Sequence, residues 1–349
     1  MLQTLTALLL LVGLGGVSLG VVWLLIGLRA KDSIWKRACR PLIGGLFLTA
    51  AGLLAPGAAP PEAPERPQVQ AAEATFVDGI APKPMLATHA RRAYALNGTG
   101  AVSLWGEPIP DPLAAQGVVS RVTVGREHLC VLRPTGRIEC WGEQHEGQAS
   151  PPAGTYTEIA AGTEHTCALD TDGETWCWGR RDGRLMAPEG VRLRQIASSD
   201  QHTCGIDMQG AVHCWGCPSA WAQACQPPKG TFREVSAGHR HSCGILADGT
   251  TRCWGSNDHG QSSPPQVRLT TLAAGWTQTC GLTASGEIQC WGCSGRLQRL
   301  DPTQASHCSA PAGQFSALSA GDIWGSCALR AKDGSAVCWG GSARTEEPR

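Results

Sequence analysis

The stretch Gly162–Gly179, GTEHTCALDTDGETWCWG, contains the pattern that decides the fold. Its cysteines, Cys167 and Cys177, lie ten residues apart around the turn sequence Asp172-Gly173. A short loop that ends in a glycine of positive φ joins antiparallel strands, so residues ten apart face each other across a hairpin. Facing positions suit a disulfide where the strands approach closely, at a non-hydrogen-bonded pair. The stretch therefore predicts a β-hairpin with one cross-strand disulfide.

The same pattern recurs along the chain with a period near 37 residues. The dipeptide Trp-Gly begins at Trp105, Trp141, Trp178, Trp215, Trp254, Trp291 and Trp339. Six copies carry the cysteine pair: Cys130-Cys140, Cys167-Cys177, Cys204-Cys214, Cys243-Cys253, Cys280-Cys290 and Cys327-Cys338. In the first copy Tyr94 and Leu104 take the two cysteine positions, and an apolar cross-strand pair is weaker than a covalent link. We expect the first repeat to be the loosest.

Each first cysteine follows a β-rich run that ends in small residues, such as YTEIAAG at Tyr156–Gly162. Strand, glycine corner, hairpin and a Pro/Gly-rich return predict about four short strands per repeat, as in a propeller blade. Seven such units closing on themselves would hide most sheet edges. The predicted fold is all-β, a seven-bladed β-propeller over residues 81–345.

The remaining cysteines are outside the hairpins. Cys217-Cys225 and Cys293-Cys308 bracket insertions in the fourth and sixth repeats, and each insertion is predicted to be closed by its own disulfide. The seventeenth, Cys39, follows the first apolar segment and is expected to stay reduced. Zinc clusters are the alternative for paired cysteines, but one facing pair per repeat and the expected location outside the cytoplasm favour disulfides.

The N-terminal region predicts a membrane anchor before the propeller. Residues 1–28 contain an uncharged apolar run long enough for a transmembrane helix. Residues 29–40 form a basic loop expected in the cytoplasm. Residues 41–58 form a second apolar segment, which is either a short transmembrane helix that closes a hairpin or part of an internal signal sequence. Residues 59–80 are a Pro/Ala-rich linker. Both alternatives place the propeller outside the cytoplasm, in a bacterial periplasm or at the cell surface.

The motif resembles the regulator of chromosome condensation repeat family, as in GTEHTCALDTDGETWCWG and in GHRHSCGILADGTTRCWGSNDHGQ at Gly238–Gln261. The resemblance covers about Met85–Gly340 and implies a seven-bladed propeller. The cysteines make the chain similar to the disulfide-bearing exported or cell-surface branch of that family. The chain lacks a basic tail, and its 29 Lys and Arg balance 29 Asp and Glu, so we expect no nucleic-acid partner.

Several side chains have both a functional and a structural interpretation. His128, His165, His202 and His241 occupy one position in successive repeats; a metal-binding ring is possible, but one structural histidine per blade is favoured, since Gln278 and Arg92 take the same place. The repeat tryptophans are interpreted as core residues, and DTDGETW at Asp170–Trp176 as a hairpin despite its likeness to a sialidase Asp-box. With no nucleophile elbow, HExxH or phosphate loop, we predict no catalytic residue, metal or cofactor.

One face of the predicted propeller gathers the variable residues. The loop after the first strand of each repeat and the insertions after the third strand should lie on the same side. The predicted binding face comprises Arg126, Glu127, Thr163, Glu164, Asp200, Gln201, Trp221, His239, Arg240, Trp276, Thr277 and Trp324. Trp221, Trp276 and Trp324 are the expected anchors, because tryptophan is enriched at interface centres. The alternative is that Trp276 and Trp324 only pack between blades.

These features predict a membrane-tethered, extracytoplasmic propeller that is not an enzyme. We expect its partner to be a protein; a glycan is the less favoured hypothesis. An inhibitor or regulator of a secreted enzyme is the second hypothesis. A carbohydrate-active enzyme is the third, because propellers can place carboxylates on loops of separate blades.

Overall fold

A computed structural model describes residues 81–89, 92–106, 117–293, 308–321 and 325–340. All of these belong to one compact unit, Gln68–Arg349; the other unit, Met1–Pro67, lies outside the described residues together with both predicted apolar segments and Cys39. Within the described ranges, no helix combines the length and the apolar character needed to span a bilayer.

The described residues form seven three-stranded antiparallel sheets, each made of consecutive strands. The innermost strands are β1 (Met85–His89), β4 (Arg121–Val124), β7 (Tyr156–Ala161), β10 (Leu193–Ser198), β13 (Phe232–Ala237), β16 (Leu269–Ala274) and β19 (Phe315–Ala320). The middle strands are β2 (Arg92–Leu96), β5 (His128–Leu132), β8 (His165–Asp170), β11 (Thr203–Asp207), β14 (His241–Leu246), β17 (Thr279–Thr283) and β20 (Ser326–Arg330). The outer strands are β3 (Val102–Gly106), β6 (Ile138–Gly142), β9 (Thr175–Gly179), β12 (Val212–Trp215), β15 (Thr251–Gly255), β18 (Ile288–Trp291) and β21 (Ala336–Trp339).

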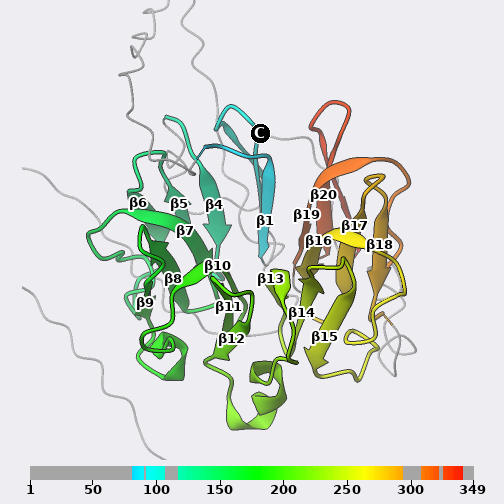
Figure 1. Ribbon diagram of the computed structural model, residues 1–349. Coiled ribbons are helices and arrows are strands. Elements are labelled where there is room, and N and C mark those ends of the chain that lie inside the picture. The colour runs from blue at the N-terminus through cyan, green and yellow to red at the C-terminus, as the bar shows by residue number, and fades with distance from the viewer. Residues whose placement is uncertain (1–80, 90–91, 107–116, 294–307, 322–324, 341–349) are drawn as a thin grey trace, which may run out of the picture. The chain divides into compact units, whose positions relative to one another are not determined.

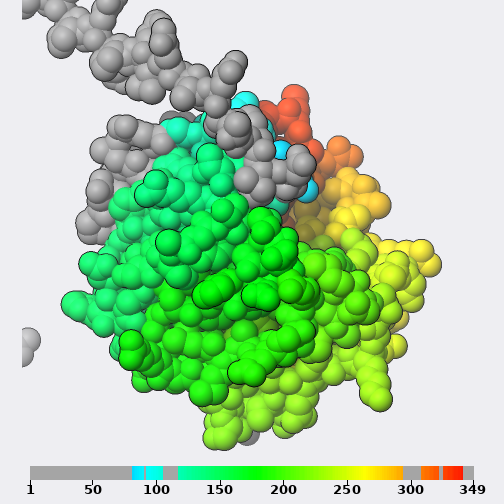
Figure 2. Space-filling model, turned by 60° about the vertical axis from the view of Figure 1, so that its left-hand side comes forward, coloured from blue at the N-terminus to red at the C-terminus, as the bar shows by residue number. Residues whose placement is uncertain are grey.

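The seven sheets close into a ring. Each innermost strand contacts the innermost strand of the next sheet, and β1 contacts both β4 and β19. Figure 1 shows the cyan strand β1 between β4 and the red strands of the last sheet, and Figure 2 shows successive sheets side by side along the surface. At the closure, Thr88 Oγ1 and Ser319 Oγ form a hydrogen bond of 2.8 Å. This is the ring of a seven-bladed propeller.

The hairpin predicted for each repeat is present with the expected register. Cys167 pairs with Cys177 across β8 and β9, and Tyr94 pairs with Leu104 across β2 and β3. The turn glycines have positive φ, for example 79° at Gly173. The cysteine Cα atoms are 4.1 Å apart in the Cys167–Cys177 disulfide, the close approach of a non-hydrogen-bonded pair.

The structure contains eight disulfides among the described residues. They are Cys130–Cys140, Cys167–Cys177, Cys204–Cys214, Cys217–Cys225, Cys243–Cys253, Cys280–Cys290, Cys293–Cys308 and Cys327–Cys338. These are the pairs that the sequence spacing predicts. The hairpin pairs sit between blades, with Cys167 and Cys204 fully buried.

The expectation of about four strands per repeat is wrong for the described residues, where each sheet has three. The return segment between β6 and β7 explains why: its Gln148 carbonyl accepts hydrogen bonds from Trp178 Nε1 at 2.8 Å and from Thr166 Oγ1 at 3.2 Å. Side chains of the next blade thus satisfy the return backbone that a fourth strand would have paired. The prolines Pro151 and Pro152 in the same segment also lack the N–H that a ladder requires. Here blades A to G are the sheets in chain order, beginning at β1, β4, β7, β10, β13, β16 and β19.

The repeat tryptophans have the predicted structural role. Trp178, Trp215, Trp254, Trp291 and Trp339 are 6–8% exposed. The Trp254 and Trp291 indole N–H groups donate to the carbonyls of Ala224 and Gln261 at 2.9 Å, which ties the preceding return segment to the blade.

Candidate functional site

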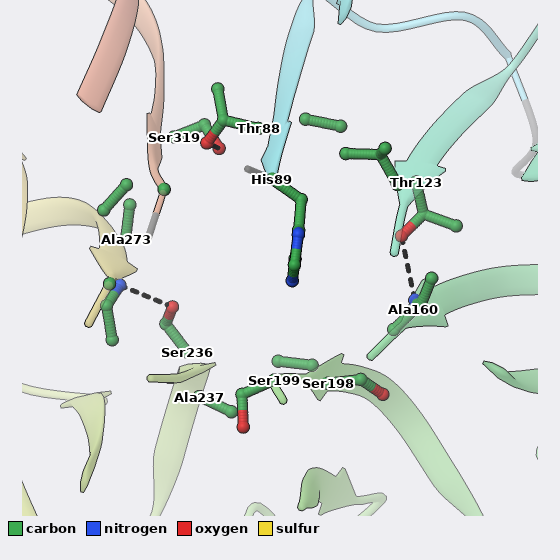
Figure 3. A pocket seen from close by; sticks show the side chains of 18 of the residues that line it. Thr88, His89, Thr123, Ala160, Ser198, Ser199, Ser236, Ala237, Ala273 and Ser319 are labelled. Atoms are coloured by element: carbon green, nitrogen blue, oxygen red, sulfur yellow. Dashed lines mark hydrogen bonds between the residues drawn. The ribbon is translucent and has the colours of Figure 1, made fainter. Parts of the chain in front are cut away.

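The first strands of all seven blades surround an axial cavity of about 310 Å³. Small side chains line most of it, including Ala160, Ala273, Ser198 and Ser319 (Figure 3). Two carboxylate residues, Glu158 and Asp200, and two histidines, His89 and His239, also line it. The cavity therefore has a polar, acidic character that the Ala- and Ser-rich strand ends alone would not give.

Glycine recurs at one position near the cavity mouth. Gly125, Gly162, Gly238, Gly275 and Gly321 each directly follow an innermost strand. A Cβ at Gly162 would collide with the ring of His165 and with the carbonyl of Ser199, so this glycine makes room for the histidine of its own blade. The N–H groups at these positions are used within the blade; that of Gly162, for example, donates to the His165 carbonyl at 2.8 Å.

Blades A and D depart from this rule. In blade D, Ser199 takes the position, and its hydroxyl forms a hydrogen bond with Nδ1 of its own His202 at 3.0 Å. In blade A, His89 occupies the glycine position. It lies three residues before Arg92 and pairs with it across β1 and β2, just as Gly162 lies three residues before His165. Arg92 replaces the histidine and reaches away to the neighbouring blade, donating to the Arg126 carbonyl at 2.6 Å and to Glu127 at 3.0 Å. Without a histidine beneath it, position 89 has room for a side chain, and Figure 3 shows the imidazole projecting into the middle of the cavity.

Asp200 is held between two imidazoles at the cavity mouth. Its Oδ2 accepts a hydrogen bond from His239 Nδ1 at 2.5 Å, and His89 Nε2 lies 3.4 Å from its Oδ1. Burial acts to raise the pKa of Asp200, but the His239 hydrogen bond and the adjacent His89 outweigh it and hold that pKa well below its usual range. Asp200 is thus an ionised carboxylate that is 19% exposed in its side chain.

Aromatic rings continue outward from Asp200. Trp276 stacks on His239 with centroids 3.7 Å apart and an interplanar angle of 9°. The ring centroids of Trp221 and His239 are 5.2 Å apart, and the Arg240 guanidinium lies 4.4 Å from the Trp221 ring centroid. We call Asp200, Trp221, His239, Arg240 and Trp276 the mouth cluster. All five were predicted as binding-face residues.

Trp221 reaches this cluster because of the first disulfide-closed insertion. It lies in the 3₁₀ segment η4 (Ser219–Cys225), which the Cys217–Cys225 disulfide closes. The insertion follows the outer strand of blade D, whereas His239 follows the inner strand of blade E. Their ring contact places the insertion and the first-strand loop on the same side of the propeller, as expected for antiparallel blades.

The other predicted binding-face residues that the structure describes do not join the mouth cluster. Glu127 binds Arg92, and Glu164 forms ion pairs with Arg180 at 2.8 Å and Arg184 at 3.2 Å. The Arg126 side chain is exposed, whereas Thr163, Gln201 and Thr277 are half-buried. Trp324 lies outside the described residues. His89 was missed by the sequence analysis, although its departure from the repeated glycine is visible in the sequence.

The four repeat histidines link adjacent blades, which is the structural role favoured from the sequence. Nε2 of each forms a hydrogen bond with a hydroxyl of the next blade: His128–Thr166 at 2.8 Å, His165–Thr203 at 3.0 Å, His202–Ser242 at 2.7 Å and His241–Thr279 at 2.8 Å. Burial lowers the pKa of His128 and His202 to about 4, and that of His165 and His241 to about 3. In the described residues, no three His, Cys, Asp or Glu side chains are grouped to hold a metal ion.

The hairpin interpretation of DTDGETW is also consistent with the structure. The Asp170 carboxylate accepts hydrogen bonds from the Asp172 and Glu174 backbone N–H groups, both at 2.9 Å, and from Trp176 Nε1 at 3.0 Å. These bonds close the turn between β8 and β9.

The geometry defines a disulfide-linked seven-bladed propeller with an acidic, aromatic channel mouth. The sequence profile described as "Regulator of chromosome condensation (RCC1) repeat" matches residues 156–184, 193–220 and 232–261, so these three consecutive units are RCC1 repeats. No curated protein matches the chain in sequence.

Solved structures extend the likeness beyond the three repeats. The entire ectodomain of the receptor kinase CR4 from Physcomitrella patens is 26% identical with a TM-score of 0.61, over 74% of this chain and 73% of that one. The CRINKLY WD40 ectodomain of the receptor kinase ACR4 from Arabidopsis thaliana is 28% identical with a TM-score of 0.50, over 59% of this chain and 78% of that one. Human WBSCR16, at 15% identity and a TM-score of 0.53 over 69% of this chain and 86% of that one, shares the fold.

Proposed function

We propose that the chain is a membrane-tethered, extracytoplasmic protein-binding module, without enzymatic activity, that engages its partner through the mouth cluster. The membrane tether rests on the apolar segments in residues 1–28 and 41–58. The extracytoplasmic location is supported by the eight disulfides, which persist in oxidising compartments, and by the similarity to two receptor-kinase ectodomains.

The observation that carries the binding role is the half-exposed aromatic cluster at the mouth. Trp221 and Trp276 lie against His239, and the insertion that carries Trp221 is fixed by Cys217–Cys225. Tryptophan and arginine are the residues most enriched among interface hot spots, and a rigid segment loses little conformational entropy on binding. Trp221 and Arg240 therefore form a ready binding surface beside the channel.

The test compares tryptophan truncations inside and outside the mouth cluster. Trp221→Ala and Trp276→Ala should each weaken partner capture from a membrane fraction by about tenfold or more, because a hot spot contributes about 2 kcal/mol. Trp176→Ala is the matched control, since Trp176 is 47% exposed on an outer strand away from the cluster. Equal capture by all three variants, or loss of capture only for Trp176→Ala, would overturn the proposal.

A further inference from the structure

The cavity beneath the mouth cluster has its own chemistry. Among the described lining residues, the acidic side chains are Asp200 and Glu158, and there is no Lys or Arg. Burial raises the pKa of Glu158, although Arg121, 3.9 Å away, and Lys83 act against this. A volume of about 310 Å³ is at the small end of the range of roughly 300–1,000 Å³ found for small-molecule sites.

The mouth offers hydrogen-bond acceptors rather than backbone donors. The N–H groups of Gly125, Gly162, Ser199, Gly238 and Gly275 all donate to carbonyls within their own blades, at 2.8–2.9 Å. An anion would therefore find no free backbone N–H at these positions. A cation would meet the Asp200 carboxylate and the ring of Trp276, which also lines the cavity, and aromatic faces attract cations.

The contact between His89 and Asp200 is the weakest part of this arrangement. It crosses the channel, because blades A and D are separated by two blades on one side of the ring and three on the other. Its 3.4 Å separation is long, and both ring nitrogens of His89 are buried without a hydrogen bond. Leaving buried donors and acceptors unsatisfied costs free energy, so a better partner for Asp200 can displace this imidazole.

We propose that the axial cavity binds one organic cation, an alkylammonium or guanidinium group, which lies against Asp200 in the place of His89. The Asp200 carboxylate accepts hydrogen bonds from the N–H groups of the cation, and Trp276 provides an adjacent aromatic face. His89 moves aside, because only its long contact with Asp200 holds it across the mouth. The cation is either a free small amine or a Lys or Arg side chain presented by a protein, and the binding chemistry is shared by both. The proposal does not depend on the role of Trp221 in partner capture.

The test measures binding of n-butylguanidine and n-butylamine to the purified full chain by isothermal titration calorimetry, with sodium butyrate as the matched anion. The wild type should bind both cations saturably and should not bind butyrate. Asp200→Asn should weaken both affinities by about tenfold or more, the range for a hydrogen bond to a charged group. Asp172→Asn is the control, because Asp172 is exposed in the turn at the other end of its blade.

Two variants of His89 keep the test decisive if Asp200→Asn fails to fold. His89→Gly restores the residue that most other blades carry and should bind the cations at least as tightly as the wild type. His89→Lys places a tethered ammonium beside Asp200 and should lose cation binding while keeping the near-ultraviolet circular dichroism of the wild type.

The proposal is overturned if the wild type binds neither cation, if butyrate binds as well as the cations do, or if a folded Asp200→Asn or His89→Lys binds them like the wild type. The neutral-ended peptide acetyl-Gly-Arg-Gly-amide then separates the two sources. Tighter binding of the peptide than of n-butylguanidine indicates a protein side chain, whereas weaker or equal binding indicates a free small cation.

Discussion

Replacing one inter-blade histidine should change how the stability of the propeller depends on pH. His165 is fully buried, is hydrogen-bonded to Thr203 at 3.0 Å, and has its pKa lowered by burial, with Arg184 adding to the effect, from 6.5 to about 3. The unfolded chain therefore takes up a proton at this site below pH 6.5, whereas the folded chain does not. The stability that neutral His165 contributes is complete above pH 6.5 and is lost as the pH falls toward 3.

The magnitude follows from proton linkage. In the window where only the unfolded state is protonated, each such histidine lowers the free energy of unfolding by about 1.4 kcal/mol per pH unit. His128, His202 and His241 respond in the same direction, so the wild type should lose up to about 5 kcal/mol per pH unit in the upper part of this window.

His165→Gln is the informative substitution, because glutamine is native at the same position of blade F. There Gln278 Nε2 reaches the Gly321 carbonyl at 3.5 Å. At pH 7.5 the variant should be less stable by about 1–3 kcal/mol, through the weaker link to Thr203 and poorer packing on Gly162. Between pH 6.5 and 4.5 it should regain about 2.3 kcal/mol relative to the wild type, since one protonation site is gone.

The assay is urea unfolding of the full chain with intact disulfides, followed by tryptophan fluorescence at half-unit steps of pH. His145→Gln is the control, because the His145 side chain is 86% exposed. Parallel curves of free energy against pH for the wild type and His165→Gln, between pH 7 and pH 5, would refute the reasoning. They would mean that His165 gains its proton in the folded state as readily as in the unfolded state.

Three further predictions test the disulfides, the topology and the glycine position. Peptide mapping of the exported protein without reduction should recover the eight pairs seen in the structure; bound zinc with free thiols would contradict them. A thiol reagent that cannot cross membranes should fail to label Cys39 in intact cells and label it after lysis, and labelling before lysis would reverse the predicted orientation. Gly238→Ala should lower the free energy of unfolding by about 1–3 kcal/mol, because its Cβ would lie 2.6 Å from both the Gly275 carbonyl and the His241 ring, whereas Gly98→Ala, with its nearest neighbour 4.0 Å away, should be mild. Equal melting temperatures for these two alanine variants would contradict this prediction, because they would mean that the neighbouring backbone and the His241 ring shift to accommodate the added methyl group at little cost.

The blade and its hairpin could be predicted from the sequence because both depend on local pattern. The register of β8 and β9 follows from the ten-residue spacing of Cys167 and Cys177 and from the turn glycine between them. Because side chains alternate between the two faces of a strand, one fixed pair sets all the others. The number of strands could not be predicted in this way. Whether the return segment pairs as a fourth strand depends on side chains of the next blade, such as Trp178 and Thr166, which both donate to its Gln148 carbonyl.

The residues of the mouth cluster were predicted from the sequence, but their contacts with one another were not. Asp200, His239 and Trp276 occupy the same position in three consecutive blades, so the repeat alignment brings them side by side. Their specific bonds, and the reach of Trp221 from its insertion, depend on rotamers and on the path of η4. Residue spacing in the sequence predicts neither the rotamers nor the path of η4.

His89 shows what a departure from a repeat can mean physically. Five other blades carry glycine at this position, where a Cβ would strike the neighbouring blade or the structural residue of the same blade. Blade A has lost that residue, because Arg92 stands in its place and turns outward to Glu127. The two exchanges fit together: removal of the histidine from beneath position 89 creates the space that the imidazole of His89 needs to enter the channel and approach Asp200 from the opposite side of the ring. Blade D also lacks the glycine, but its Ser199 hydroxyl bonds to His202 of the same blade at 3.0 Å. The first blade differs because it sends an imidazole across the channel, and this is the difference on which the proposed cation site rests.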